Sequence, residues 1–324
     1  MNLLITGGTG FFGKSILRYL AFSNQKPSCS DVSITLLSRH PEKFICEYGY
    51  LLERLNATVQ YGDILQRESL PWEKNFSHVL HAAADSSLGP SLDSMSRYDQ
   101  IVSGTRNILD LALNTKAKRF LLTSSGAVYG AQPQDLIAIP EGYLGMPDPL
   151  DAINAYGVAK RTAEHLCALY YKKFGLNFSI ARCFAFVGQD LPLDIHFAIG
   201  NFISDALKNS SIEVKGDGSP LRTYLNQNDL AEWLIKILLD GRPGEAYNVG
   251  SDEKISIRDL AYLVRDIIAP HKKVSIIGTP SLEIRNRYVP DISKVRAEFN
   301  LQVKISLRDS IAQVQETLSI GKKL

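Results

Sequence analysis

The chain has 324 residues, of which 45% are apolar and 22% charged, a balance typical of a globular protein with enough material for a large core. Its 36 basic and 34 acidic residues are interspersed and give a formal net charge of +2, which excludes the basic stripe of a nucleic-acid-binding protein. No run of about 18 apolar residues occurs, so we expect no membrane span.

The cysteines give no sign of a metal site or a disulfide framework. Cys29, Cys46, Cys167 and Cys183 form no C-x-x-C pair and have no histidine cluster beside them. Cys167 and Cys183 stand in apolar runs, so we expect them to be buried thiols. The apolar run at the N-terminus is too short for the core of a signal peptide. These features favour a reduced, cytoplasmic setting and predict no metal site.

Short β-like runs alternate with segments of helical period up to about residue 185. The expected strands are 2–6, 33–38, 58–61, 78–83, 120–124 and 178–183. The clearest expected helices are 12–21, 101–113 and 155–174. Because strands alternate with helices, we predict an α/β fold, a doubly wound parallel Rossmann sheet with helices on both faces.

After residue 185 the rhythm changes, and glycines and prolines separate shorter elements. We expect helices at 229–239 and 257–268 and a strand at 247–249, with a last helix that follows Ser306 and runs through Leu318. The expected caps of the three helices are Asn228, Ser256 and Ser306. We therefore expect residues 1–185 to form the Rossmann domain, joined by some later segments. Residues 186–324 are expected to form mainly a smaller α/β region.

The first expected strand ends in a glycine-rich turn, Thr6-Gly7-Gly8-Thr9-Gly10-Phe11-Phe12-Gly13, which opens a helix. Glycines at this spacing allow a tight turn, close approach of the backbone to a pyrophosphate, and close packing of helix on strand. The free N–H groups at the start of the helix favour phosphates. A plain strand-to-helix turn is the alternative. The residues expected to contact a dinucleotide here are Gly7, Thr9, Gly10, Phe11, Phe12 and Gly13.

The end of the second expected strand bears on the choice between NAD and NADP. An NAD site usually places an acid there for the ribose 2′-hydroxyl, whereas an arginine accommodates the 2′-phosphate of NADP. Ser38 and Arg39 stand at this end, with no acid, and Arg39 could bind a phosphate in a forked geometry. A solvated surface arginine is the alternative. We expect NADP(H) to be preferred, with NAD(H) possible.

The third expected strand ends in a similar position. Asp63 and Ile64 follow it, and we expect both at the cofactor. Asp63 could meet the adenine amino group, although a simple turn carboxylate explains it nearly as well.

Tyr156 and Lys160 share one face of the helix expected at 155–174, one turn apart. An ammonium beside a phenol favours the phenolate, so we expect the pKa of Tyr156 to fall from about 10 towards working pH. Ser125 ends a strand whose carboxyl end faces the ligand crevice, where its hydroxyl can bind the reacting oxygen. Each feature alone is common, but together with the glycine turn they predict hydride-transfer chemistry. Ser125, Tyr156 and Lys160 are the expected catalytic residues.

With these motifs in this order, the sequence resembles the extended short-chain dehydrogenase/reductases, specifically the NAD(P)-dependent epimerase/dehydratase family that acts on sugar nucleotides. A central match is Ser124-Ser125-Gly126-Ala127-Val128-Tyr129-Gly130. The other matching stretches are 6–13, 81–84, 104–105, 156–160, 216–218, 228–231, 247–251 and 290–294. They cover nearly the whole chain, which makes the resemblance more specific than any one motif.

The resemblance implies further roles for residues along the chain. It implies cofactor contacts from Ala82, Ala83, Ala84, Tyr156 and Lys160. The second half of the chain would hold the nucleoside diphosphate of a nucleotide-sugar substrate, with contacts from Asn201, Arg222 and, more weakly, Arg285, beside Ser125. A homodimer through the helices at 101–113 and 155–174 is also implied, although their apolar faces could equally be buried within one subunit.

Departures from the family pattern bear on the reaction. Family 4,6-dehydratases carry Asp-Glu after the catalytic hydroxyl, and decarboxylases carry a Glu near it, whereas Gly126 and Ala127 stand here. Dehydration and decarboxylation are therefore disfavoured. Arg39 favours NADPH-dependent reduction of a 4-keto sugar nucleotide, with 4-epimerisation as the alternative. Ile101 and Ala185 each replace a family asparagine, which indicates an altered substrate pocket. A non-catalytic nucleotide sensor is disfavoured because such proteins typically lose the Tyr/Lys pair.

Overall fold

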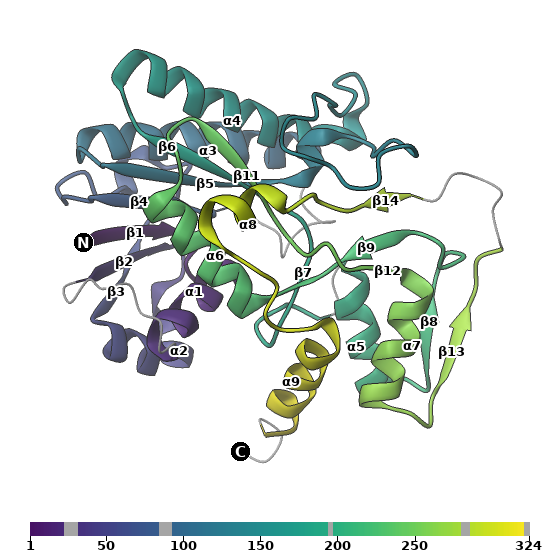
Figure 1. Ribbon diagram of the computed structural model, residues 1–324. Coiled ribbons are helices and arrows are strands. Elements are labelled where there is room, and N and C mark those ends of the chain that lie inside the picture. The colour runs from purple at the N-terminus through teal and green to yellow at the C-terminus, as the bar shows by residue number, and fades with distance from the viewer. Residues whose placement is uncertain (23–31, 84–92, 194–196, 280–285, 321–324) are drawn as a thin grey trace.

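The computed structural model describes residues 1–22, 32–83, 93–193, 197–279 and 286–320. Its centre is a seven-stranded sheet in which every neighbouring pair is parallel (Figure 1). In spatial order the strands are β11 (Glu245–Val249), β6 (Phe178–Cys183), β5 (Arg119–Ser125), β4 (His78–His81), β1 (Asn2–Thr6), β2 (Ser33–Ser38) and β3 (Ala57–Tyr61). The chain builds outward from β1 in one direction and then from β4 in the other, which confirms the doubly wound fold.

Alternate residues of the buried strands feed two separate cores. In β1, Leu3 and Ile5 pack into the core on one side of the sheet, and Leu4 packs into the core on the other. Successive side chains of a strand point to opposite faces, so a parallel sheet with apolar residues at every position must be covered on both. The covering helices are α1 (Phe11–Phe22), α2 (Pro41–Leu55) and α6 (Gln227–Asp240) on one face, and α3 (Ser94–Asn114) and α4 (Ala155–Phe174) on the other.

The apolar faces of α3 and α4 are buried within the single chain. Ile108 and Leu109 of α3, and Ala163 and Leu166 of α4, belong to the core beneath these helices. This packing is the alternative that the sequence left open. The homodimer therefore stays a prediction.

Local sequence signals set several boundaries correctly. Strands β2 and β6 and helices α4 and α7 (Ile257–Ile268) have the predicted bounds. Ser256 caps α7, and Ser306 accepts a hydrogen bond of 3.1 Å from the N–H of Asp309 at the start of α9 (Leu307–Ile320). The predicted Asn228 cap of α6 is wrong. Asn226 is the cap and accepts from the Asn228 N–H at 2.8 Å, because the helix begins earlier, at Gln227.

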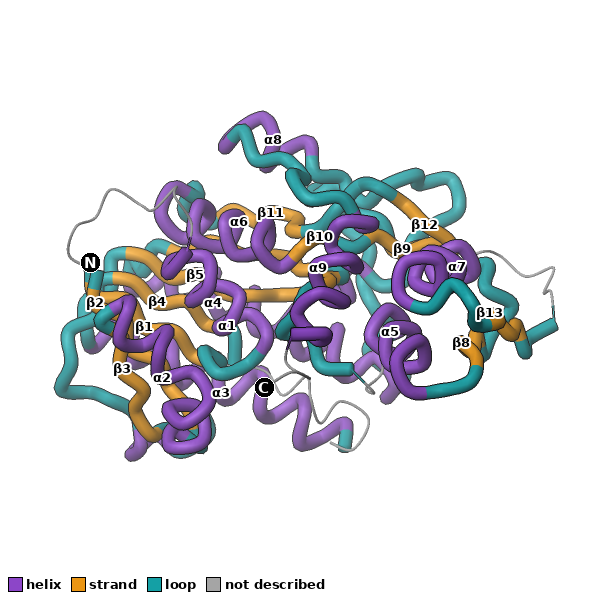
Figure 2. The backbone as a smooth tube through the Cα atoms, turned by 90° about the horizontal axis from the view of Figure 1, so that it is seen from below, coloured by secondary structure: helices purple, strands orange, loops and turns teal. Residues whose placement is uncertain are grey.

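The smaller region gathers beyond one end of the large sheet, around α5 (Ala198–Lys208) and α7 (Figure 2). Its short strands pair as three small sheets. These strands are β7 (Phe186–Val187), β8 (Ser211–Val214), β9 (Leu221–Thr223), β10 (Leu225–Asn226), β12 (Lys254–Ser256), β13 (Lys273–Ile276) and β14 (Arg287–Tyr288). Later segments also return to the large sheet, since β11 pairs with β6, and α8 (Ser293–Phe299) lies against β11.

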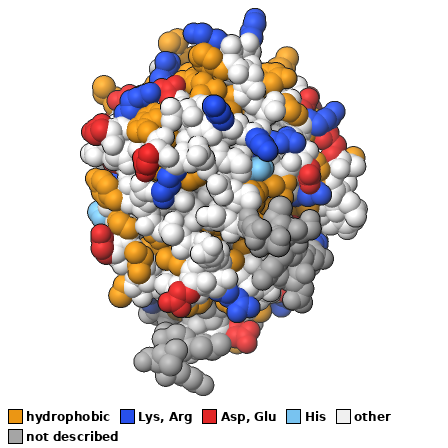
Figure 3. All heavy atoms as spheres, turned by 90° about the vertical axis from the view of Figure 1, so that its left-hand side faces the viewer, with side chains coloured by type: hydrophobic (Ala, Val, Ile, Leu, Met, Phe, Trp, Pro, Cys, Tyr) orange, Lys and Arg blue, Asp and Glu red, His pale blue; other side chains and the backbone are white. Residues whose placement is uncertain are grey.

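The surface and the thiols agree with the composition. On the face drawn in Figure 3, acidic and basic side chains are interspersed among apolar ones. Cys167 and Cys183 are buried, as predicted, and Cys46 is exposed. Among the described helices, none combines the length and the apolar character that a membrane crossing requires.

Candidate active site

The three predicted catalytic side chains meet where β5 ends against α4. Ser125 is the last residue of β5, and its hydroxyl lies beside the phenol of Tyr156 in the first turn of α4. One turn further along α4, the Nζ of Lys160 lies 6.0 Å from the centre of the Tyr156 ring. Ser125 and Lys160 are buried, with 7% and 4% of their surfaces exposed. The fold thus assembles a serine, a phenol and an ammonium in one partly enclosed site.

A tight turn fixes the side chain of Ser125, the predicted catalytic serine. Its Oγ accepts a hydrogen bond of 3.1 Å from the backbone N–H of Ala127, at the start of the 3-10 turn Gly126–Tyr129. This bond selects one rotamer of Ser125. The turn thus holds the hydroxyl at the carboxyl end of a central parallel strand, the end at which ligands bind in sheets of this kind.

Burial dominates the electrostatics of the pair on α4. It raises the pKa of Tyr156, an effect that the Ser125 hydrogen bond and the charge of Arg97 oppose. It also lowers the pKa of Lys160 to about 8. The prediction that Lys160 lowers the pKa of Tyr156 is therefore wrong for the protein without its cofactor and substrate. The physical reason is that Lys160 Nζ donates to the carbonyl oxygen of Thr123, at 2.8 Å, and not to the phenol.

The buried ammonium of Lys160 predicts a dependence of stability on pH. Its pKa falls from 10.5 to about 8, so between these values the unfolded chain binds a proton that the folded chain has released. Stability therefore rises with pH across this window, by about 3 kcal/mol. We expect the unfolding free energy of the wild-type protein, relative to Lys160→Met, to increase by this amount in urea titrations without cofactor. A difference that does not change with pH would contradict the assignment.

The glycine-rich turn has no room for side chains. Gly7 adopts a φ of +70°, and a Cβ atom there would lie 2.6 Å from the carbonyl oxygen of Ala82. A Cβ atom on Gly13 would lie 2.0 Å from the carbonyl oxygen of Gly8. Ala83 is held beside this turn, since its N–H donates to the Thr6 hydroxyl at 3.2 Å. The predicted residues Gly7, Gly13, Ala82 and Ala83 therefore form one close-packed backbone cradle, as pyrophosphate binding requires.

The remaining residues of the turn divide between packing and exposure. The rings of Phe11 and Phe12 pack near Phe186, with ring centres 6.3 and 5.4 Å away. Gly10 is exposed and Thr9 is half-buried, so the backbone at the start of α1 faces outward. The rings of Phe11 and Phe12 therefore anchor the turn. Contacts from these four residues to a dinucleotide stay predictions.

The residues predicted at the adenosine end lie at the ends of β2 and β3. Ser38 is buried, and its hydroxyl accepts from the N–H of His40 at 3.1 Å, whereas Arg39 is exposed at the end of β2. Asp63 Oδ1 accepts from the N–H of Leu65 at 2.9 Å, so one oxygen serves as a turn carboxylate. Ile64 is buried. The predicted residue Ala84 lies outside the described residues.

The predicted substrate residues lie in the smaller region. Arg222 of β9 donates to the carbonyl oxygens of Leu221 and Asn286 at 2.9 and 3.2 Å, and burial lowers its pKa. It stands opposite Tyr288 of β14 and so lies near the catalytic serine. Asn201 lies in the second turn of α5 and is half-buried. Arg285 lies outside the described residues.

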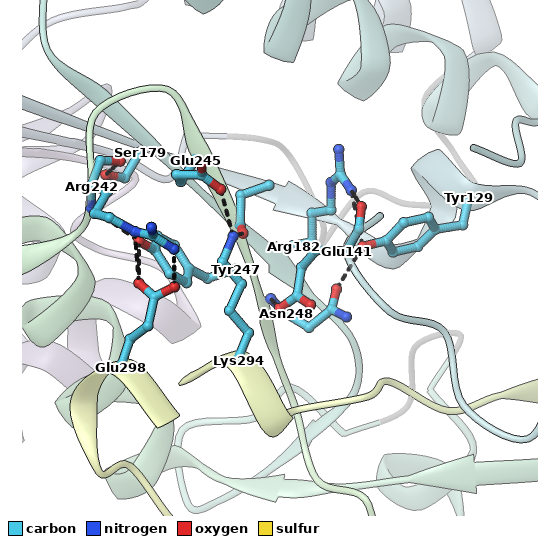
Figure 4. A network of polar contacts seen from close by, with 11 residues as sticks. Tyr129, Glu141, Ser179, Arg182, Arg242, Glu245, Tyr247, Asn248, Lys294 and Glu298 are labelled. Carbon is cyan, nitrogen blue, oxygen red and sulfur yellow. Dashed lines mark hydrogen bonds and ion pairs between the residues drawn. The ribbon is translucent and has the colours of Figure 1, made fainter. Parts of the chain in front are cut away.

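A buried polar network supports the catalytic elements from behind. Glu164 of α4 accepts from the Ser124 hydroxyl at 2.6 Å and pairs with Arg182 of β6 at 2.8 Å. Arg182 also donates to the Tyr129 hydroxyl at 2.9 Å, and Tyr129 donates to the side chain of Asn248 at 2.8 Å (Figure 4). The network thus ties β5, α4, β6 and β11 together, and it fixes the strand that ends at Ser125 against the helix that carries Tyr156.

Two residues at the site, Arg97 and Tyr288, belong to none of the motifs described above. The Arg97 side chain of α3 has two guanidinium nitrogens that are shielded from solvent and have no hydrogen-bond partner among the described residues, and its charge acts on Tyr156. Tyr288, from the far end of the chain, places its hydroxyl beside Ser125 and Gly126. The proximity of Tyr288 to the matching stretch at 290–294 could have pointed to it. Nothing local marks Arg97.

Comparisons with known proteins agree with this geometry. A sequence model described as the NAD dependent epimerase/dehydratase family matches residues 3–250. UDP-glucuronic acid decarboxylase 3 from Arabidopsis thaliana is 28% identical over 327 residues, an alignment that covers 98% of this chain and 88% of the relative.

Two solved structures share the fold. UDP-glucose 4-epimerase from Thermotoga maritima with UDP-glucose has a TM-score of 0.82 at 20% identity, covering 99% of this chain and 100% of the other. RMD from Pseudomonas aeruginosa, complexed with NADPH, has a TM-score of 0.79 at 23% identity, covering 97% of each chain. The fold, the assembled site and the family match over most of the chain agree. The chain is an enzyme of the NAD-dependent epimerase/dehydratase family, within the extended short-chain dehydrogenase/reductases.

Proposed function

We propose that this enzyme reduces a 4-keto sugar nucleotide with NADPH. The observation that carries the proposal is the assembled set of Ser125, Tyr156 and Lys160, followed by a position that holds no acid or base. Gly126 occupies that position, and the rings of Phe184 and Tyr288 crowd it. The site can therefore move a proton at an oxygen. It lacks a group directly after Ser125 to act at a neighbouring carbon, as elimination or decarboxylation would need.

The residues present fit a nicotinamide cofactor. The cradle around Gly7 and Gly13 excludes side chains and opens at the start of α1, which suits a pyrophosphate. Structural neighbours of the chain are complexed with NAD or NADPH. When bound, the cofactor supplies the hydride. Arg39 at the end of β2 supports NADPH, because a guanidinium matches a 2′-phosphate and no acid is present for a 2′-hydroxyl.

The roles of the catalytic residues follow from their positions. Tyr156 donates its proton to the C4 oxygen of the sugar as that oxygen gains negative charge. Ser125 donates a hydrogen bond to the same oxygen and orients it. Lys160 holds the nicotinamide ribose, and the charge of Arg97 favours the phenolate left on Tyr156. Arg222, beside the site in β9, binds the diphosphate of the substrate.

A panel of nucleotide sugars tests the proposal. We would incubate the protein with UDP-, dTDP-, CDP- and GDP-sugars, including 4-keto-6-deoxy forms, and follow NADPH absorbance together with the products. Consumption of one NADPH per 4-keto sugar supports the reductase. Loss of carbon dioxide from a UDP-glucuronic acid substrate, the activity named for the Arabidopsis relatives, would refute it.

A 4-epimerase is the second candidate. The structural likeness to UDP-glucose 4-epimerase favours it, and an epimerase would use Ser125, Tyr156 and Lys160 in the same roles. It differs in returning the hydride to the same sugar, which first has to rotate in the site. The panel separates the two reactions, since an epimerase interconverts 4-hydroxy sugars without net consumption of cofactor.

Replacing Arg39 by alanine tests the choice of cofactor. If the guanidinium binds the 2′-phosphate, we expect KM for NADPH to rise by about tenfold to a hundredfold, the loss of one charge-assisted contact or two. KM for NADH should change by less than about twofold, because NADH has no 2′-phosphate. Initial rates with each cofactor measure both constants. The nearby Lys43→Ala variant is the matched control, and equal effects of Arg39→Ala on both cofactors would contradict the assignment.

A further inference from the structure

Tyr288 brings a second phenol to the catalytic serine from a distant part of the chain. It lies on the two-residue strand β14, opposite Arg222 of β9. The next residue is anchored on both sides, since the Val289 N–H donates to the side chain of Gln132 at 3.0 Å and its carbonyl accepts from Ile139 at 2.8 Å. These contacts fix the backbone that carries the phenol.

The Tyr288 ring occupies the space beside the residue that follows Ser125. A Cβ atom on Gly126 would lie 2.5 Å from the Tyr288 hydroxyl oxygen and 2.8 Å from Cζ of Phe184, which is too close for any real contact. The rings of Phe184 and Tyr288 pack with their centres 4.5 Å apart. Gly126 and this pair of rings therefore fit each other, and a side chain at this position would require the rings to move.

Ser125 stands between two phenols, since its side chain acts on both Tyr156 and Tyr288, and the Tyr288 hydroxyl also lies against Gly126, the next residue. A serine hydroxyl has one hydrogen to donate and two lone pairs that accept. The backbone N–H of Ala127 uses one lone pair, at 3.1 Å. If the hydrogen of Ser125 points towards Tyr156, the remaining lone pair is left for the Tyr288 hydroxyl. Successive hydrogen bonds of this kind polarise one another, which strengthens the last of them.

We propose that Tyr288 is a positioning residue of the active site. Its phenol donates to Ser125, which leaves the one serine hydrogen for Tyr156 before the substrate binds and for the reacting oxygen once the substrate is bound. Its ring keeps the position after Ser125 free of any side chain, so proton transfer is confined to the oxygen that Tyr156 serves. The inference rests on the proposed function, because it concerns the proton that Tyr156 transfers.

Tyr288→Phe tests the hydroxyl while it keeps the ring. Tyr143→Phe is the matched control, because Tyr143 belongs to the same aromatic cluster but packs near Tyr129, with ring centres 6.3 Å apart. In NADPH-bound protein with a 4-keto sugar nucleotide, we expect Tyr288→Phe to lower kcat about tenfold and to leave KM within about twofold, the pattern of a contact that acts on the transition state. Tyr143→Phe should leave both constants unchanged.

The pH profile separates positioning from a merely structural role. The groups that act on Tyr156 from neighbouring elements are Arg97 of α3 and Cys183 of β6, with Lys160 on its own helix. Tyr288→Phe leaves all of these in place. Without the Tyr288 donor, Ser125 stabilises the phenolate of Tyr156 less, so the fall of kcat at high pH should move to higher pH.

A measurement without substrate keeps this inference separate from the proposed reaction. The difference in phenolate absorbance between each protein and its Tyr156→Phe partner reports the titration of Tyr156 in cofactor-bound protein. A titration that moves to higher pH in Tyr288→Phe supports the inference, even if the wild-type protein reduces no 4-keto sugar nucleotide and the proposed function fails. A titration and kcat equal to those of Tyr143→Phe would overturn it.

The steric half of the inference has its own test. Gly126→Ala should lower the melting temperature of the cofactor-bound protein, because its methyl group meets the Tyr288 hydroxyl. In a Tyr288→Ala background, Gly126→Ala should lower the melting temperature by less, since one of the two crowding rings is gone. An equal fall in melting temperature in both backgrounds would show that the Tyr288 ring does not exclude a side chain from position 126.

Discussion

Tyr156→Phe is expected to lower kcat by about a thousandfold, within the range of about 10²–10⁴ for the loss of a general acid. The variant keeps the ring and removes the hydroxyl that lies beside Ser125 at the end of β5. The glycine cradle lies on a different element, so the affinity for NADPH should change by less than about threefold. Initial rates on the best substrate and a fluorescence titration with NADPH measure the two quantities.

Tyr170→Phe is the control for this prediction. Tyr170 lies on the same helix, and its hydroxyl donates to Asp110 at 2.6 Å, away from Ser125. Its loss should leave kcat unchanged. Normal turnover by Tyr156→Phe would refute both the reductase and the epimerase, because each uses this phenol to move the proton.

Glu164→Gln is expected to lower the free energy of unfolding by about 3 kcal/mol, because it leaves a buried guanidinium without its counter-charge. Arg182 and Glu164 have only 15% and 12% of their side chains exposed and are joined by two hydrogen bonds, of 3.0 and 2.8 Å. Burial lowers the pKa of Arg182, but the hydrogen bonds and the charge of Glu164 raise it by more than that. The pKa of Arg182 is therefore above its usual value. Urea unfolding measures the loss. Activity should fall as well, since Glu164 also holds Ser124, next to the catalytic serine.

Asp240→Asn provides the comparison for an exposed pair. Asp240 pairs with Lys236 at 2.8 Å on the surface of α6, where both side chains are about half exposed. Solvent screens such a pair, so its loss should cost less than about 0.5 kcal/mol. Equal losses for the two variants would mean that the buried network does not hold β5, α4 and β6 together.

Much of the fold followed from local patterns, and the exceptions have local causes. Strands β2 and β6 and helix α4 ended where their apolar runs and helical period ended. Helix α2 was not predicted, and in the structure it is kinked at Tyr48, whose φ of −128° is not helical. Helix α3 begins before the predicted residue 101, since the Asp93 side chain caps it at Met95 and Ser96, in turns that are polar and exposed. An apolar period cannot mark turns that contribute little to the core.

The sequence by itself determined the parts of the site that depend on short spacing. Gly7 and Gly13 shape a turn within eight residues, and Tyr156 and Lys160 share a helix face because they are one turn apart. Ser125 faces the crevice because it ends a parallel strand. These relations are set by the geometry of one turn, one helix or one strand, so they hold wherever the element lies.

Only the tertiary structure decided what surrounds these residues. Packing brings Tyr288 to Ser125 across more than 150 positions of sequence and places Arg97 near Tyr156. It also reversed the expected direction of the Tyr156 pKa, because burial outweighs the effects of Ser125 and of the Arg97 charge, while the Lys160 ammonium is turned towards the backbone. Burial and long-range proximity are properties of the assembled core, and no local spacing encodes them.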